Sequence, residues 1–316
     1  MGRFMTTTQK IFVGILVAAF LLISFGVALY SANLPGPPKA LTVVTTFYPL
    51  YYFAKAITDD NATVTMLIPD NVEPHTWEPT ISDIIAVSNA RVFVYNGAGF
   101  EPWVANVLSS IQNKDLIVVD TSTNMSMELP NVSGATFQQT QHGGADPHFW
   151  LDPLRAKIQV DNIAKGLRQA DPSHAATYSV NADLLKTRLD VLNQQYHMGL
   201  RNRTKNDIIT AHEGFDYLAN RYGFVAHAAI GISADAQPST QDIARLVQLV
   251  KDLDLHYVFV EPIFSDIYMD TIAQETSTHI LVLDGIHGRT GIHASLDYFQ
   301  IMEENLRNLK IGLEVP

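Results

Sequence analysis

Two short segments of the chain place a histidine in a setting suited to binding a metal ion. They span residues 73–79 and 146–153, and both contain Pro-His-x-Trp followed by an acid and a proline. Proline fixes its own φ and biases the preceding residue towards an extended conformation, so His75 and His148 each lie on a stiff, non-helical backbone. We interpret both segments as rigid loops that direct two imidazoles at one point.

The composition limits what such a site can be made of. The chain has 316 residues and a formal net charge of -11, which argues against nucleic-acid binding because nothing would neutralise the phosphates. It contains no cysteine, which excludes thiolate metal sites, disulfides and cysteine nucleophiles. Any metal must therefore be bound by nitrogen and oxygen.

The elements that must position the histidines alternate between strand and helix. Strands are predicted at 41–47, 63–68, 91–95 and 116–119, and again at 207–210, 224–229, 257–260 and 280–283. This alternation predicts parallel sheets with helices on both faces. Residues 173–198 contain no proline or glycine and predict one long helix between the two series. Acids three residues after Thr80 and Ser239 predict capping boxes at two further helix starts.

We therefore predict an α/β fold of two similar lobes, each a four-stranded, mainly parallel sheet flanked by helices, joined by one long backbone helix. The predicted lobes are 41–170 and 205–316, with the linking helix at 171–204. Ligands of such sheets bind beyond the carboxyl ends of the strands. His75, His212 and Asp284 each follow a predicted strand and His148 lies one loop further on, so all four can converge on the cleft between the lobes.

The N-terminus carries a membrane signal. Residues 11–30 are an uncharged, largely apolar run of about the 20 residues that a membrane-spanning helix needs. Arg3 and Lys10 precede it, which predicts residues 1–10 in the cytoplasm and the body outside. We favour a retained anchor followed by a linker at 31–40 over a cleaved signal, because the cleavage site is poor. Outside the cell, glycosylation sequons would begin at Asn61, Asn124, Asn131 and Asn202.

Several ordered motifs resemble the zinc/manganese solute-binding proteins of ABC importers. They are Thr-Phe-Tyr-Pro at 46–49, the first histidine segment continued to 80, Asn-Gly-Ala-Gly-Phe-Glu-Pro-Trp at 96–103, the second histidine segment, Ala-His-Glu-Gly-Phe-Asp-Tyr at 211–217, Pro-Ser at 238–239, Phe-Val-Glu-Pro at 259–262 and Leu-Asp-Gly at 283–285. The resemblance covers residues 41–309. It implies the two-lobed fold predicted above and a monomer that carries metal to a separate permease and ATPase subunit.

The resemblance also implies a ligand set. His75, His148 and His212 match the family's first three ligands, and Asp284 matches the carboxylate that follows the last strand. The chain departs from the family after that position, since Asp-Gly-Ile-His-Gly at 284–288 replaces Asp-Pro-Leu-Gly. His287 is therefore an alternative fourth ligand. Only His142 remains of the His-rich loop that often precedes the second ligand.

Three imidazoles and one carboxylate form a four-coordinate shell suited to Zn2+, bound here as the transported ligand. Mn2+ prefers more oxygen and is the alternative cargo, while copper and nickel also bind such a shell. A complete shell leaves no position for a reactive water, so we expect a binding protein and no enzyme. Retention should fall as pH drops through the histidine range.

Two other functions remain open from the sequence. A membrane-anchored zinc hydrolase would use His75, His148 and His212 with Glu213 as the base, and it would need a metal-bound water. A surface adhesion protein is the other, and would at most add to metal binding. The remaining histidines match no ligand position and are expected in the core or on the surface: His174, His197, His227, His256, His279 and His293.

Overall fold

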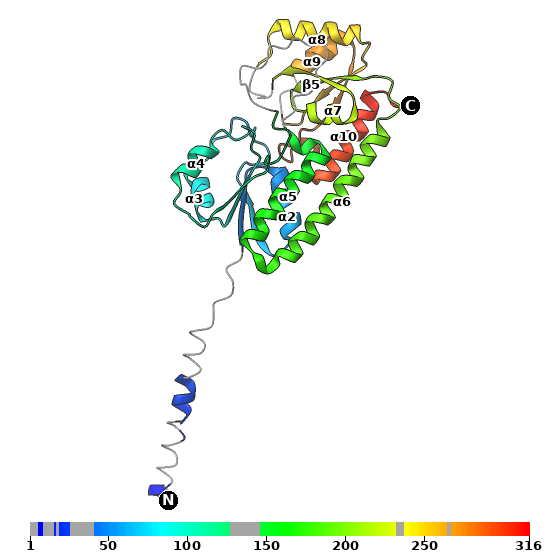
Figure 1. Ribbon diagram of the computed structural model, residues 1–316. Coiled ribbons are helices and arrows are strands. Elements are labelled where there is room, and N and C mark those ends of the chain that lie inside the picture. The colour runs from blue at the N-terminus through cyan, green and yellow to red at the C-terminus, as the bar shows by residue number, and fades with distance from the viewer. Residues whose placement is uncertain are drawn as a thin grey trace, which may run out of the picture. The chain divides into compact units, whose positions relative to one another are not determined.

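The structure is a computed structural model that describes residues 6–8, 16, 19–25, 41–126, 146–231, 237–263 and 267–316 (Figure 1). The chain divides into two compact units, residues 1–40 and 41–316. The loop histidine His142 and the sequon at Asn131 lie outside the described residues.

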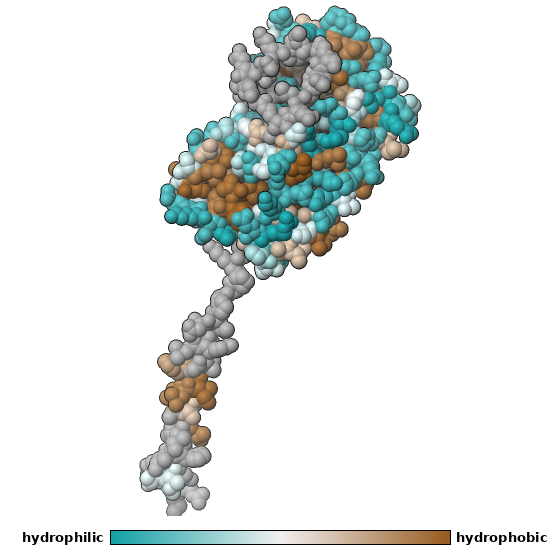
Figure 2. Space-filling view, viewed as in Figure 1, coloured by the Kyte–Doolittle hydropathy of each residue, from teal (hydrophilic) through white to brown (hydrophobic). Residues whose placement is uncertain are grey.

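The first unit contains the predicted anchor, most of which lies outside the described residues. Residues 19–25 are helical, and their large apolar side chains are exposed (Figure 2). Within the part of the chain that the structure describes, every helix is too short or too polar to cross a membrane. The anchor and the linker therefore stay predictions from the sequence.

The first lobe is built on a four-stranded parallel sheet. Its strands are β1 (Leu41–Thr45), β2 (Ala62–Met66), β3 (Val92–Tyr95) and β4 (Ile117–Asp120), in the order β2-β1-β3-β4. Val43 on β1 lies beside Val64 on β2 and Val92 on β3. This sheet confirms the parallel α/β architecture predicted from the alternation of strands and helices.

Helices cover both faces of this sheet, as Figure 1 shows. They are α2 (Tyr48–Thr58), α5 (Pro153–Ala170) and α6 (Ala175–Gly199) on one face, and α3 (Ile81–Asn89) and α4 (Val104–Ser110) on the other. Successive strand residues point to opposite faces, so Val43 joins the core beneath α2 and α5, while Val44 and Phe93 join the core beneath α3 and α4. A strand buried on both faces tends to have an apolar and β-branched sequence, as β1 and β3 do.

The two predicted capping boxes are present. The hydroxyl of Thr80 accepts a hydrogen bond from the backbone N–H of Asp83, whose carboxylate accepts one from the backbone of Thr80. Ser239 and Asp242 form the same pair at the start of α8 (Thr240–Asp252). Each box satisfies backbone donors that a helix start leaves unpaired, and it thereby sets the residue at which the helix begins.

The second lobe differs from the prediction in its pairing. Its strands are β5 (Asp207–His212), β6 (Val225–Ile230), β7 (Tyr257–Val260) and β8 (His279–Val282), accompanied by α7 (Asp216–Tyr222), α8, α9 (Ile267–Thr276) and α10 (Tyr298–Gly312). Across the described residues these strands form two parallel pairs, β5-β6 and β7-β8, and not the single four-stranded sheet expected. β5 and β7 lie side by side, so the four strand ends still gather at one edge.

The predicted long helix, α6, is confirmed and joins the lobes. A 3-10 turn at Pro172–His174 leads into it, and its inner face buries Leu185, Leu189, Leu192 and Tyr196. The Tyr196 hydroxyl donates to the backbone oxygen of Met302 on α10 at 2.7 Å. One apolar core includes side chains of both lobes, among them Val43 and Phe259. Because wide opening would expose this shared core, the fold favours small lobe movements.

Candidate metal centre

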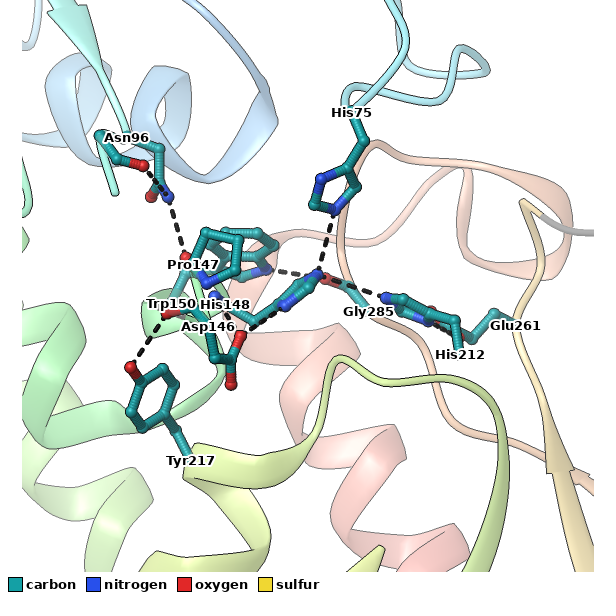
Figure 3. A network of polar contacts seen from close by, with 11 residues as sticks. His75, Asn96, Asp146, Pro147, His148, Trp150, His212, Tyr217, Glu261 and Gly285 are labelled. Carbon is teal, nitrogen blue, oxygen red and sulfur yellow. Dashed lines mark hydrogen bonds and ion pairs between the residues drawn. The ribbon is translucent and has the colours of Figure 1, made fainter. Parts of the chain in front are cut away.

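Three of the sequence-predicted ligands, His75, His148 and His212, point towards one another in Figure 3. His75 lies in the loop after β2, His148 precedes the turn at Phe149–Leu151, and His212 is the last residue of β5. Nε2 of His148 lies 3.3 Å from Nε2 of His75 and 3.3 Å from Nε2 of His212. Segments more than 60 residues apart in the sequence therefore bring the Nε2 atoms of His75 and His212 next to Nε2 of His148.

These separations are those of ligands around a small ion. Zn–N bonds of about 2.0–2.1 Å in a tetrahedral shell place neighbouring ligand atoms roughly 3.3 Å apart. His148 therefore already stands at the spacing from each of the other two imidazoles that a shared zinc ion would require.

A carboxylate holds His148 in place. Oδ1 of Asp146 accepts hydrogen bonds from the backbone N–H of His148 at 2.9 Å and from its Nδ1 at 2.7 Å. The proton on Nδ1 leaves the lone pair of Nε2 facing the cluster. His148 is fully buried, and burial lowers its pKa well below the ordinary range, so it presents the neutral form that binds metals.

The second lobe repeats this arrangement at His212. Its Nδ1 contacts Oε1 of Glu261, the residue that follows β7, and both side chains are buried. Burial lowers the pKa of His212, but the charge and hydrogen bond of Glu261 outweigh burial and raise it overall. Gly214 provides the space, since a Cβ there would lie 2.5 Å from Nε2 of His212.

His75 is held differently. Its backbone N–H donates to Oε1 of Glu73 at 2.9 Å, and its ring packs edge-on against Phe100 with centroids 4.6 Å apart. It is partly exposed, whereas His148 and His212 are completely buried. The cluster therefore has one side near solvent and one side enclosed in protein.

Asp284 and His287, the two candidates for the fourth position, lie in different settings. Oδ1 of Asp284 accepts a hydrogen bond from the backbone N–H of Ile286 at 2.7 Å, and Oδ2 lies 2.7 Å from Nδ1 of His293. Both carboxylate oxygens thus contact residues of the loop that follows β8. The imidazole of His287 instead lies in the cluster, and ring nitrogens of His75, His148 and His287 all lie within 4.8 Å of one another.

Buried aromatic rings surround the histidines. Trp150 and Phe100 pack against both His148 and His287, with ring centroids 5.2 to 6.4 Å apart. Nε1 of Trp150 donates to the backbone oxygen of Gly285 at 2.7 Å, which ties the second histidine loop to the loop of His287. This apolar wall strengthens the interaction of an ion with its ligands, because it excludes water.

Sequence reasoning assigned no role to Asp146 or Glu261. Both stood inside recognised motifs, Asp-Pro-His and Phe-Val-Glu-Pro. The available signal was an acid at the carboxyl end of a buried strand for Glu261, and an acid two residues before a histidine for Asp146. Glu213, the suggested hydrolytic base, is half-buried beside Asp216, and burial raises its pKa to about 7.

The fold and the overall sequence are similar to those of known proteins. The chain is 33% identical to the high-affinity zinc uptake system protein ZnuA of Bacillus subtilis over 308 residues, which cover 95% of this chain and 97% of that protein. It is 32% identical to the zinc-binding lipoprotein AdcA of Streptococcus pneumoniae, covering 85% of this chain and 55% of AdcA. The chain thus spans about half the length of AdcA.

A solved structure covers the matching half of that relative. The Zn(II)-bound ZnuA-like domain of Streptococcus pneumoniae AdcA superposes with a TM-score of 0.74 at 31% identity, covering 87% of this chain and all of the domain. The family model described as "Zinc-uptake complex component A periplasmic" matches residues 43–312. The chain therefore belongs to the ZnuA family of zinc-uptake solute-binding proteins.

Proposed function

We propose that this protein captures Zn2+ outside the cytoplasm and delivers it to the permease of an ABC importer. The observation that carries the proposal is the position of His148 between the lobes, with its Nε2 3.3 Å from Nε2 of both His75 and His212. Proteins similar to it in sequence or in fold are named as a zinc uptake system protein and a Zn(II)-bound ZnuA-like domain. The metal is the transported cargo and has no catalytic role in this proposal.

The proposed ligands are His75, His148, His212 and His287. Asp284, the carboxylate first predicted for the fourth place, is proposed to hold the loop through Ile286 and His293 instead, because both of its oxygens are engaged there. Four imidazoles complete a tetrahedral shell and leave no position for a reactive water. This supports metal binding over the alternative of a hydrolase that uses Glu213.

A shell made of nitrogen ligands alone strengthens the preference for Zn2+ over Mn2+. Imidazole suits zinc, copper and nickel, whereas manganese favours carboxylate and water oxygens. Replacing the expected carboxylate by His287 removes the oxygen ligand that would have made the site acceptable to Mn2+. We therefore propose Zn2+ as cargo and expect copper to compete with it in the test tube.

The partners and the location follow from the proposed role. A metal carrier of this kind needs a permease and an ATPase subunit, both on separate chains. We propose that residues 11–30 keep the protein at the outer face of the cell membrane and that it works as a monomer. Partial exposure of His75 supports entry and exit of the ion at that side of the cleft.

The test is metal analysis of the purified full-length protein after competition among Zn2+, Mn2+ and Cu2+. We expect one zinc ion per chain and no retained manganese. His148→Ala and His287→Ala should lose zinc to the competitors because their affinity falls by ~100-fold or more, while Asp284→Asn should keep it. The circular dichroism and melting temperature of each metal-free variant show whether it still folds.

Other outcomes would overturn parts of the proposal. Loss of zinc in Asp284→Asn with retention in His287→Ala would restore Asp284 as the fourth ligand. Turnover of ester or peptide substrates that disappears in Glu213→Gln would favour the hydrolase. Retention of zinc by His148→Ala would contradict the proposed site as a whole.

A further inference from the structure

Two buried acids lie against the cluster, and this inference about them rests on the proposed zinc site. Asp146 is 5% exposed and Glu261 is 1% exposed. Each contacts Nδ1 of one proposed ligand, His148 in the first lobe and His212 in the second. Among the described residues, neither acid forms an ion pair with a lysine or arginine.

Without a bound metal ion, the charge of these two acids has to be balanced by protons. Burying a carboxylate costs free energy unless a positive charge or hydrogen bonds compensate for it. Oδ2 of Asp146 is buried with no hydrogen-bond partner in the described part of the chain. Two acids from different lobes flank one group of histidines, so a dication held between the imidazoles would balance both.

We propose that Asp146 and Glu261 are positioning residues for the cargo ion, which hold the imidazoles of His148 and His212 with Nε2 towards the centre and balance the two positive charges of zinc. Carboxylates behind ligating histidines orient the ring and increase its basicity. The same pair of contacts fixes one imidazole in each lobe.

The backbone around Glu261 is shaped for its carboxylate. A Cβ at Gly285 would lie 2.5 Å from Oε2 of Glu261 and 2.8 Å from Cε1 of His287. Gly285 therefore leaves space for the acid and for the proposed fourth ligand at once. Gly285 stands where the family pattern Asp-Pro-Leu-Gly has proline. The two residues by which this chain differs from that pattern, Gly285 and His287, therefore both lie next to Glu261.

The experiment compares Asp146→Asn and Glu261→Gln with the wild type in competition titrations against a zinc chelator. Both substitutions keep the shape of the side chain and remove the charge. We expect each to weaken zinc binding by roughly 10–100-fold. The matched control is Asp207→Asn, because Asp207 contacts Nε2 of His227 at 2.8 Å away from the cluster, and it should bind zinc as the wild type does.

Thermal unfolding separates positioning of the ion from a structural role. If the acids serve the ion, the metal-free variants should melt no lower than the metal-free wild type, and zinc should raise their melting temperature less. Equal losses of melting temperature with and without zinc would overturn the proposal. So would wild-type affinity in both variants.

A double-mutant cycle tests the route of the effect. Asp146→Asn should weaken binding in the wild type but add little in His148→Ala, because it acts through that imidazole. An undiminished effect in His148→Ala would contradict this. Absence of zinc binding by the wild type would instead refute the transport proposal, so the two failures are distinguishable.

Discussion

The two sides of the histidine cluster are held by different means. On the enclosed side, His148 and His212 are completely buried, and a carboxylate contacts Nδ1 of each ring. On the open side, His75 is partly exposed, and its loop is fixed through the backbone hydrogen bond to Glu73. In the proposed site, the enclosed side would supply affinity from pre-oriented ligands, and the open side would admit and release the ion.

The largest effect should come from the enclosed side. Nε2 of His148 lies 3.3 Å from Nε2 of both His75 and His212. His148→Ala therefore removes the imidazole that lies next to both of the others. If one ligand contributes about a quarter of the 10–16 kcal/mol typical of structural zinc, its loss weakens binding by ~100-fold or more. His75→Ala should weaken binding less, because water can take the vacated position at the exposed side. Isothermal titration with zinc measures both, and equal losses would contradict the distinction.

Acid should release the ion, beginning at His212. Its pKa is raised by Glu261 in spite of burial, while burial lowers the pKa of His148 and His287. A raised pKa means that a proton competes with zinc for His212 at a higher pH than for an ordinary histidine. Zinc affinity should fall by about tenfold per pH unit once that proton binds.

Glu261 is expected to have two effects: it orients His212 for zinc binding, and it raises the pKa of His212. Glu261→Gln separates the two. The variant should bind zinc more weakly at neutral pH, yet its affinity should start to fall only at a lower pH. Affinities measured from pH 8 to pH 5 give the comparison. An unchanged pH profile in the variant would show that His212 does not set the acid release.

A smaller effect should come from an ion pair that joins the lobes beside the open side. The backbone N–H and Nη2 of Arg289 donate to the two carboxylate oxygens of Asp70 at 3.0 and 3.1 Å. Both side chains are partly exposed, so the pair contributes at most about 1 kcal/mol. Arg289→Ala should speed zinc release up to roughly fivefold. Stopped-flow release into a chelator measures this. The control is Arg307→Ala, because Arg307 forms an ion pair with Glu304 within α10.

The smallest effect on zinc should come from Glu101, which supports the open side. Its carboxylate accepts hydrogen bonds from Thr46 and from the backbone of Asn96 and Gly97, next to the Phe100 that packs on His75. Burial raises its pKa to about 7, from an ordinary value of 4.5.

A carboxyl whose pKa is raised on folding favours the folded state most when it is protonated. Its contribution is complete below pH 4.5 and is lost as pH rises through about 7. Glu101→Gln should therefore flatten the fall of melting temperature between pH 5 and 8 and change zinc affinity by less than about threefold. A parallel fall in both proteins would show that Glu101 stays ionised.

Much of this architecture could be predicted because local signals and burial agree. Continuous apolar strands, the capping boxes at Thr80 and Ser239, and the uninterrupted helical run before Met198 each specify an element without tertiary information. The paired Pro-His-x-Trp segments likewise identified His75 and His148 as side chains of one cluster.

The rest depends on backbone geometry that residue types do not reveal. After β8 the chain turns at Ile286, which adopts a positive φ of 55°, and the turn brings His287 to the cluster while Asp284 faces its own loop. A positive φ at a β-branched residue is rare, so no sequence rule predicts it. The contact between Glu261 and His212 joins residues 49 apart and is visible only once β5 and β7 lie side by side.

Diffraction from crystals of the zinc-loaded protein, collected at the zinc absorption edge, tests the central claim most directly. We predict a single anomalous peak bonded to ring nitrogens of His75, His148, His212 and His287, with no bound water and with Asp284 still hydrogen-bonded to its own loop. A zinc ion that binds Asp284, or that keeps a water molecule in an open position, would contradict the account.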